Sequence, residues 1–222
     1  MPTSAPPRLC VILNAGGQSR RMGRSKALLP VPGTGLPLIQ HVALRLQSLV
    51  DDLLLLIAND PAVHAAVQIP GPVLHLQDAW PDAGAVGGLA TGIAQVDGWA
   101  AVAACDLPLV RPAIFRHLLT LAQEAGPDGQ PWDVVVPVVE GREQTLHALY
   151  HRRCLPALHA QLAVGRLRVN YFYDQVRVRR VPGDDLRFLD PELLSFVNAN
   201  TPQEWAHALD LLAQEPDAPT GR

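Results

Sequence analysis

Five short apolar runs, each followed by a longer and more polar segment, constrain the fold of this chain more than any other feature. They are "LCVILN" at 9–14, "DLLLLIA" at 52–58, "PVLHL" at 72–76, "WAAVAAC" at 99–105 and "WDVVVP" at 132–137. Because nearly every position in them is apolar, they are typical of strands in a sheet that is buried on both faces. The pattern predicts an α/β fold: a doubly wound, mostly parallel sheet with helices on both faces.

The segments between these runs have the apolar spacing of helices. Pro37 is expected to open a helix whose apolar side chains recur near the helical period as far as Val50. Further helices are expected near 61–67, 86–96, 112–125 and 153–164. A final helix begins at "TPQEW", where Thr201 caps and Glu204 closes a capping box. Segment 166–192, rich in Arg, gives no clear pattern.

Length and charge limit the classes of protein to which the chain can belong. Its 222 residues predict one domain, over 1–214, and the polar end 215–222 is expected to be a disordered tail. With 18 basic and 21 acidic residues, the net charge of -3 gives no general attraction to nucleic acid or to anionic membranes. Neither kind of partner is therefore expected.

The chain carries no recognisable membrane or export signal. No run of about 18 apolar residues could span a membrane, and "MPTSAPPRLC" lacks the pattern of a signal peptide. Cys10, Cys105 and Cys154 are an odd number without CxxC spacing, which argues against a disulfide framework and against a zinc site. We expect free thiols and a cytoplasmic location.

The loop after the first run combines small residues with a local cluster of cations. It reads "LNAGGQSRRMGRSKALL" at 13–29, with Arg20, Arg21, Arg24 and Lys26 inside seven positions. Ligands of a doubly wound sheet bind beyond the carboxyl ends of its strands, where this loop would lie. Glycines allow backbone N–H groups to approach an anion, and the cations can neutralise several phosphate charges. The loop therefore predicts a triphosphate site.

Two common phosphate-binding motifs do not match this loop. A P-loop needs Gly-Lys-Ser/Thr, whereas Gly23 is followed here by Arg24 and Ser25. A dinucleotide fingerprint needs G-x-G-x-x-G and an acidic residue about 20 positions later, where this chain has Leu and Pro. A redox enzyme with a dinucleotide cofactor is therefore disfavoured.

The pattern A-G-G-x-S-x-R-M-G-x-x-K resembles that of the molybdenum cofactor guanylyltransferases, within the wider family of MobA-like nucleotidyltransferases. Six further segments follow in the family's order: "IAND" at 57–60, "LQDAW" at 76–80, "GAVGGLATGI" at 84–93, "ACDLPLV" at 104–110, "TLHALY" at 145–150 and "VNANTPQE" at 197–204. The resemblance implies a Rossmann-like nucleotidyltransferase fold. Its N-terminal part would bind the nucleotide and its C-terminal part the acceptor.

The resemblance also implies a set of site residues. Lys26, Arg21 and Asp106 would be catalytic, with Asp106 as the ligand of a Mg2+ cofactor. The implied nucleotide contacts are Asn14, Ala15, Gly16, Gly17, Lys26, Asn59, Asp78 and Asp106. Asn198 and Asn200 would contact the acceptor or complete the metal shell, although such residues also form turns. His147 and Tyr171–Tyr173 fit a core as well as an acceptor pocket.

The implied reaction is transfer of GMP from GTP to the terminal phosphate of molybdopterin, with release of pyrophosphate. Gly16 and Gly17 favour guanine, but Asn14 stands where the family usually has Leu, and Ala85-Val86 replaces a frequent Pro-Leu. Cytidylyl transfer to molybdopterin and nucleotidyl transfer to a sugar phosphate therefore stay open, as does a nucleotide-binding partner protein without turnover. GTP and molybdopterin are the expected partners, together with transient contact to other proteins of cofactor biosynthesis.

Overall fold

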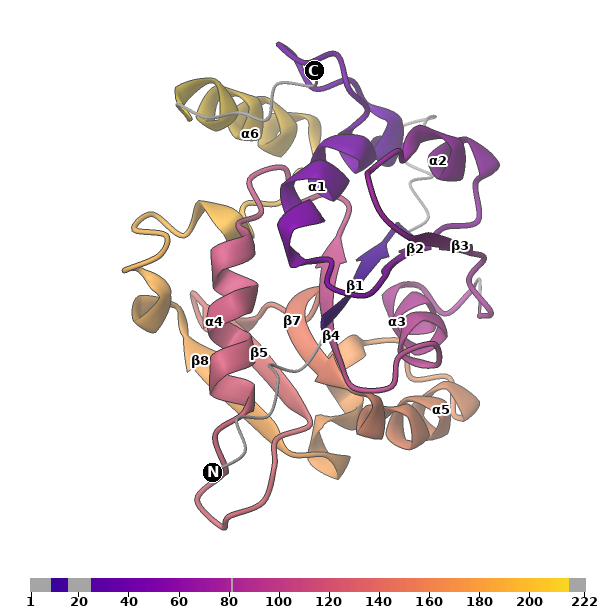
Figure 1. Ribbon diagram of the computed structural model, residues 1–222, viewed down its shortest axis with the longest axis vertical. Helices are drawn as coiled ribbons and strands as arrows, with labels where there is room; N and C mark the ends of the chain where they lie inside the picture. The colour runs from indigo at the N-terminus through magenta and orange to yellow at the C-terminus, as the bar shows by residue number, and fades with distance from the viewer. Residues whose placement is uncertain (1–8, 16–24, 81, 216–222) are drawn as a thin grey trace.

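A mixed sheet forms the centre of the molecule, and helices cover both of its faces (Figure 1). The computed structural model describes residues 9–15, 25–80 and 82–215. Within these residues the sheet has eight strands in the order β3-β2-β1-β4-β7-β5-β6, with β8 beside β5. The strands are β1 Leu9–Asn14, β2 Leu54–Ile57, β3 Val73–Leu76, β4 Trp99–Ala104, β5 Val134–Val139, β6 Arg142–Glu143, β7 His147–His151 and β8 Val178–Pro182.

The strands that were predicted from apolar runs are present, and most of the strand pairs are parallel. Val11 of β1 lies opposite Leu54 of β2 and Ala101 of β4, both in parallel register. The expected α/β class, a mostly parallel sheet between helices, is confirmed. Strand β7 was not predicted and runs antiparallel between β4 and β5. Strand β8, also unpredicted, lies inside the segment 166–192 and pairs in parallel with β5.

The predicted helices are also present, although most end earlier than expected. Their bounds are α1 Leu38–Leu46, α2 Pro61–Ala66, α3 Ala85–Ile93, α4 Pro112–Ala122, α5 Leu155–Ala163 and α6 Pro202–Gln214. The capping box of α6 is confirmed, because Thr201 Oγ1 accepts from the Glu204 N–H at 3.1 Å and Glu204 Oε2 accepts from the Thr201 N–H at 2.9 Å. This start of α6 matters below because it lies at the candidate site.

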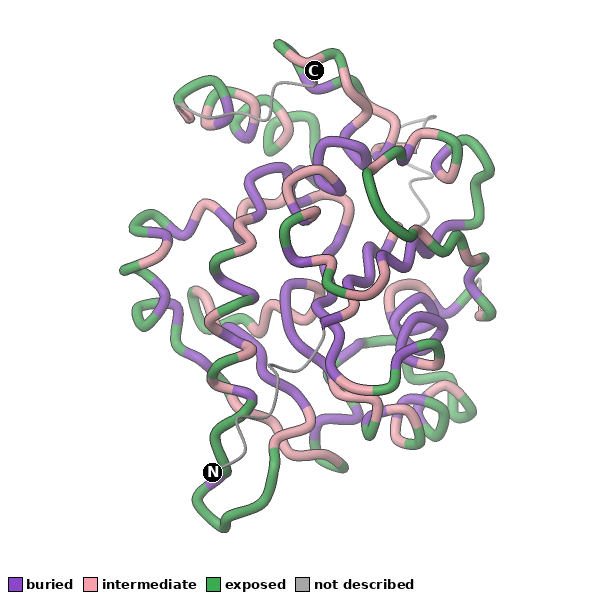
Figure 2. The backbone as a smooth tube through the Cα atoms, in the orientation of Figure 1, coloured by how far each residue is buried: buried purple, intermediate pink, exposed green. Residues whose placement is uncertain are grey.

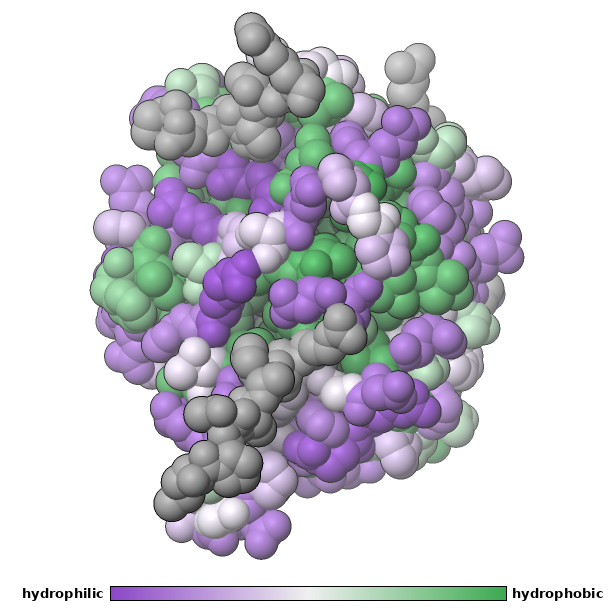
Figure 3. Space-filling model, viewed as in Figure 1, coloured by the Kyte–Doolittle hydropathy of each residue, from purple (hydrophilic) through white to green (hydrophobic). Residues whose placement is uncertain are grey.

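The two faces of the sheet carry two separate apolar cores. Val11 and Leu13 of β1 pack with α1 and α4, whereas Ile12 between them packs with α3 and α5 on the opposite face. This alternation follows from the two-residue period of a strand. Figure 2 shows buried positions running along the central strands, while exposed ones concentrate on outer helical turns and loops. In Figure 3, hydrophilic residues cover much of the rim of this face and hydrophobic ones show towards its centre.

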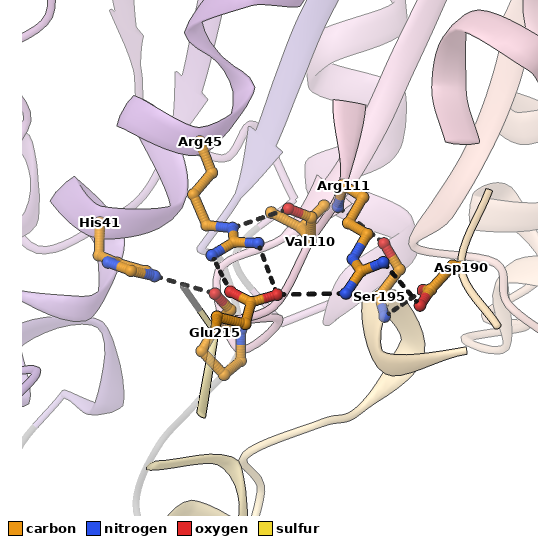
Figure 4. A network of polar contacts seen from close by, with 8 residues as sticks. His41, Arg45, Val110, Arg111, Asp190, Ser195 and Glu215 are labelled. Carbon is orange, nitrogen blue, oxygen red and sulfur yellow. Dashed lines mark hydrogen bonds and ion pairs between the residues drawn. The ribbon is translucent and has the colours of Figure 1, made fainter. Parts of the chain in front are cut away.

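A network of ion pairs fastens the end of α6 to the rest of the molecule (Figure 4). The Glu215 carboxylate lies between two guanidinium groups, 2.7 Å from Arg45 Nη1 and 3.3 Å from Arg111 Nη2. Arg111 Nη1 also lies 3.2 Å from Asp190 Oδ1. Residues 216–222 lie outside the described part of the chain.

The structure bears on the expected absence of a membrane span and on the expected free thiols. In the described part of the chain, no helix is both long enough and apolar enough to cross a membrane. Cys10, Cys105 and Cys154 are all free. Burial, followed by the neighbouring Asp106 charge, raises the pKa of Cys105 to about 12, so this thiol is protonated near neutral pH and is a poor nucleophile.

Candidate active site

A cavity of about 700 Å³ opens at the carboxyl edge of the central strands. Asn14 and Ala15 line it at the end of β1, and Asp106 lines it just after β4. Segments that are distant in sequence complete its wall: Ser25–Ala27, Glu143–His147, and Asn198, Asn200 and Thr201. Ala199, between Asn198 and Asn200, is buried and does not line the cavity. The cavity therefore lies where a doubly wound sheet binds its ligands.

Asp106 is held at this edge by its own backbone. The strand β4 ends at Ala104, and the Asp106 carbonyl accepts a hydrogen bond of 3.0 Å from the Ala199 N–H. Burial raises the pKa of the Asp106 carboxyl, and the positive charge of Lys26 partly offsets this effect. The described residues contain no group of three or more His, Cys, Asp or Glu side chains that could hold a metal ion. A single carboxylate suits Mg2+, which keeps several waters and takes further ligands from substrate phosphates.

Lys26 meets the C-terminal part of the chain in the same cavity. Its Nζ donates to Asn200 Oδ1 at 3.0 Å, across 174 positions of sequence. The Asn200 N–H in turn donates to Glu204 Oε2 at 2.8 Å, so the capping box of α6 holds Asn200 in place. No local sequence pattern predicts this contact between Asn200 and Lys26. Asn198 lines the cavity too, and its Nδ2 donates to the Phe196 carbonyl at 3.3 Å.

Asn14 connects the end of β1 to the start of α3. Its side chain is buried, and Nδ2 donates to the Ala85 carbonyl at 3.1 Å. Gly88 leaves the room for it, since a Cβ at that position would lie 2.6 Å from Asn14 Oδ1. A polar side chain is thus built into a wall of the cavity where the resembling family usually has Leu.

Asn59 and Asp78 lie beside each other but do not line this cavity. Asn59 Oδ1 accepts from the Asp78 N–H at 2.9 Å, and Asp78 Oδ1 accepts from the Trp80 N–H at 2.8 Å. Burial raises the pKa of Asp78, and its buried Oδ2 has no hydrogen-bond partner among the residues described. Asp60 caps α2 by accepting from the Ala62 N–H at 2.9 Å. The two predicted nucleotide contacts therefore form one cluster outside the cavity that holds Lys26 and Asp106.

Some of the predicted phosphate contacts fall on residues that the structure does not describe. Gly16, Gly17 and Arg21 lie within 16–24, outside the described residues, as do Arg20 and Arg24. Ala15 is described, and its N–H donates to the Ile57 carbonyl at 2.9 Å. Of the predicted site residues that are described, Asn14, Ala15, Lys26, Asp106, Asn198 and Asn200 share the cavity.

One wall of the cavity is formed by Glu143–His147, of which the sequence pointed to 145–147 but not to Glu143 and Gln144. Its only signal was the segment "TLHALY", which contains His147 but not Glu143. His147 is almost fully buried and lies between Phe115 and Phe196, with ring centroids 4.4 and 4.5 Å away. Burial lowers the pKa of His147 to about 3, so it is neutral near neutral pH. It is a core residue at the edge of the site.

Comparison with known proteins places these residues in a family context. The model of the MobA-like NTP transferase domain matches residues 10–176. The match includes Lys26 and Asp106, whereas Asn198 and Asn200 lie beyond it. Most of the chain thus carries the pattern of this domain.

Individual relatives agree with that match. The chain is 31% identical to the molybdenum cofactor guanylyltransferase of Desulfosudis oleivorans, over 87% of this chain and 90% of the relative. It is 33% identical to a probable molybdenum cofactor guanylyltransferase of Bacillus licheniformis, over 85% of this chain and 90% of the relative. Among solved structures, molybdopterin-guanine dinucleotide biosynthesis protein A from Archaeoglobus fulgidus has a similar fold. The TM-score is 0.77 at 23% identity, over 93% of this chain and 99% of that one.

Proposed function

Since this chain belongs to the family of MobA-like NTP transferase domains, we propose that it transfers GMP from GTP to the terminal phosphate of molybdopterin, with release of pyrophosphate. Two observations support the reaction. The names of its relatives specify molybdenum cofactor guanylyl transfer. The observation that carries the proposal is that Lys26 and Asp106, from distant parts of the chain, line one cavity large enough for a nucleotide.

This reaction needs no general base; the protein has to position the two substrates and neutralise the phosphate charges. An oxygen of the acceptor phosphate, already an anion near neutral pH, forms a bond to the α-phosphorus of GTP. The bond from that phosphorus to the β-phosphate oxygen breaks, and pyrophosphate leaves with the electron pair. Lys26 would hold the β- and γ-phosphates, on which negative charge grows. Arg21 and the backbone N–H groups of Gly16 and Gly17 would assist it, whereas the Ala15 N–H is already bonded to the Ile57 carbonyl.

Asp106 would hold a Mg2+ ion, which supplies neutralisation of the phosphate charges when it is bound. The carboxylate must be ionised for this role, and Lys26 favours that form electrostatically. Asn198 and Asn200 line the same cavity, where their amide oxygens could reach the metal shell or the acceptor. Loss of one such preorganised contact typically costs about 3 kcal/mol, or roughly a hundredfold in rate.

The test is a pyrophosphate-release assay with molybdopterin and GTP, CTP or ATP, run on the wild-type protein and on Asp106→Ala. We expect release with GTP and Mg2+, and a loss of roughly a hundredfold or more in the variant. Nucleotide binding without pyrophosphate release would instead indicate a partner protein without turnover. Activity that survives Asp106→Ala would remove the metal assignment.

Cytidylyl transfer to the same acceptor is the second candidate, and Asn14 is the observation that favours it. Its buried amide contributes a polar group to the cavity wall, where most members of the resembling family would have an apolar one. Thermal shifts with GTP, CTP and ATP in the presence of Mg2+ separate the two candidates. A selective ligand at a hundred times its Kd stabilises the protein by about 2.7 kcal/mol. We expect the largest shift with GTP, whereas a larger shift with CTP would reverse the base assignment.

A further inference from the structure

Glu143, at the end of β6, presents a fixed carboxylate to the wall of the cavity. Its Oε1 accepts from Arg180 Nε at 2.8 Å, and its Oε2 accepts from Asn170 Nδ2 at 2.8 Å. Both donors come from the segment 166–192, in which the sequence gave no clear pattern. Only 17% of the Glu143 side chain is exposed. Two long-range partners therefore hold this carboxylate in one orientation.

The residues that follow Glu143 are fixed as well. The Gln144 N–H donates to the Pro137 carbonyl at 2.9 Å. Tyr150 Oη donates to the Thr145 carbonyl at 2.7 Å, and the buried hydroxyl of Tyr173 lies 2.7 Å from the same Tyr150 Oη. A wall with this many internal hydrogen bonds is preorganised, so ligand binding does not have to include the entropic cost of fixing these side chains.

The place of Glu143 in the sheet separates it from the nucleotide contacts. Asn14 ends β1 and Asp106 follows β4, whereas β6 lies three strands beyond β4 in the sheet order. At about 4.8 Å per strand, this corresponds to roughly 14 Å along the sheet. With the base near β1 and the phosphates near Lys26 and Asp106, the end of the cavity at β6 is left for the acceptor.

The charge balance around Glu143 suits a neutral ring with hydrogen-bond donors. An unpaired carboxylate would repel the phosphates that share the cavity, but Arg180 offsets its charge. A carboxylate has about four acceptor sites, so two remain after Arg180 and Asn170 have bonded. A planar ring with two adjacent N–H donors on one edge would occupy both of the remaining acceptor sites.

We infer that Glu143 is the recognition residue for the acceptor, and that it binds the 2-amino and N3–H donors of a 2-amino-4-oxo pterin ring. This inference rests on the proposed function, which supplies the pterin. Asn170 and Arg180 act as positioning residues, because they orient the carboxylate and do not themselves contact the ring. The base of GTP has the same pair of donors, and a carboxylate also accepts from neighbouring hydroxyls, so guanine and a sugar phosphate are the competing ligands.

The test measures binding of 6-hydroxymethylpterin by its fluorescence, without turnover, in the full-length protein. Glu143→Gln replaces one acceptor by a donor that opposes the ligand's own N–H. We expect it to weaken pterin binding by about 10- to 100-fold. Glu140→Gln, an exposed change in the same hairpin, is the matched control and should leave pterin binding unchanged. The Kd of GTP should stay within about twofold in both variants.

A ligand series keeps the inference testable if Glu143→Gln folds poorly. In the wild-type protein, 3-methylpterin, which lacks the N3–H donor, should bind at least about tenfold more weakly than the parent pterin. Equal binding of the two pterins, unchanged affinity in a folded Glu143→Gln, or saturation by a sugar phosphate in place of pterin would each overturn the assignment. The proposed function fails by a different readout, which is absence of pyrophosphate release from GTP in the wild-type protein.

Discussion

At the scale of single residues, Lys26 is hydrogen-bonded to the neutral side chain of Asn200, which is compatible with phosphate binding by Lys26. Asn200 takes one hydrogen bond from Lys26 Nζ and leaves two donors and the full positive charge for a ligand. A carboxylate in that position would neutralise the ammonium group and compete with phosphate. Asn200 can therefore orient Lys26 without blocking it.

A double-mutant cycle on GTP binding tests this coupling. Asn200→Ala should raise the Kd of GTP by about fivefold, the worth of one hydrogen bond of about 1 kcal/mol. The same change in a Lys26→Ala background should have almost no effect, because the partner is already gone. If Asn200 contacted only the acceptor, the Kd of GTP without acceptor would not change in either background.

His147 makes a second prediction at this scale, on acid stability. Burial lowers its pKa from 6.5 to about 3, and the nearby Ser195 backbone offsets this only partly. Between about pH 3 and pH 6.5, His147 is therefore protonated in the unfolded chain and neutral in the folded protein. The resulting contribution to stability is complete above about pH 6.5 and is lost as the pH falls towards about 3.

We expect this group to account for about 2 kcal/mol of the stability lost between pH 7 and pH 5. Urea unfolding of the wild type and of His147→Leu at both pH values measures it. The variant should be less sensitive to acid by that amount, although His41, whose pKa burial also lowers, remains. An identical loss in the two proteins would show that His147 is already protonated in the fold or is not buried as described.

At the scale of elements, helix α3 packs so closely that glycine is required in its first turns. A Cβ on Gly87 would lie 2.5 Å from the Trp80 carbonyl oxygen and 3.0 Å from Asp78 Oδ1. The first of these atoms belongs to the backbone and cannot move independently. The glycines of "GAVGGLATGI" thus bring α3 against the segment that carries Asp78.

Gly87→Ala should therefore destabilise the protein, with Gly98→Ala as its control. Overpacking costs about 1–3 kcal/mol, and the better helix propensity of alanine offsets about 1 kcal/mol of this. A Cβ on Gly98 would meet no atom within 4 Å, so that variant should lose no stability. The free energy of unfolding in urea compares them, and an equal stability of the two variants would contradict the close packing of α3.

The elements also show what the sequence could and could not predict. The apolar runs and the "TPQEW" cap gave local signals, and β1, β4 and α6 formed where those signals lie. Strand β8, "VRRVP", was missed because its two successive arginines break any apolar run and its pairing with β5 is distant in sequence. Arg179 Nη1 donates to the Leu121 carbonyl of α4, whereas Arg180 pairs with Glu143. Strand β7 is antiparallel within a mostly parallel sheet, and its place between β4 and β5 depends on pairings distant in sequence.

The same limit applied to the site. Asp106 and Lys26 stand in local motifs, so they could be selected from the sequence together with the kind of ligand. The contact of Lys26 with Asn200 spans 174 positions, and the Glu143 cluster joins β6 to the segment 166–192. Neither has a local pattern, because only the fold brings these side chains together.

At the scale of the whole molecule, the network around Glu215 fastens α6, whose other end carries Asn200 and Thr201 into the cavity. Arg45 and Glu215 are mostly buried, with 11% and 14% of their side chains exposed. Glu215→Gln would leave two guanidinium groups facing each other without the anion between them. The site's C-terminal wall thus depends on a contact far from the cavity.

Glu215→Gln should cost about 2 kcal/mol of stability, less than for a fully buried pair because Arg111 is partly exposed. Asp184→Asn is the control, since the Asp184 side chain, paired with Arg187, is 86% exposed and its loss should stay within about 0.5 kcal/mol. Chemical denaturation measures both. Equal small losses would show that the network does not fasten α6.

The central claim is that the cavity of Lys26 and Asp106 supports nucleotidyl transfer. Its most direct test follows radioactive phosphate from GTP into the products. The protein is supplied with molybdopterin and Mg2+ and with GTP labelled with 32P at either the α- or the γ-phosphate. We predict that the α label enters the molybdopterin product and that the γ label leaves in pyrophosphate. Transfer of the γ label to the acceptor, or its release as single phosphate with the α label left on GDP, would contradict the account.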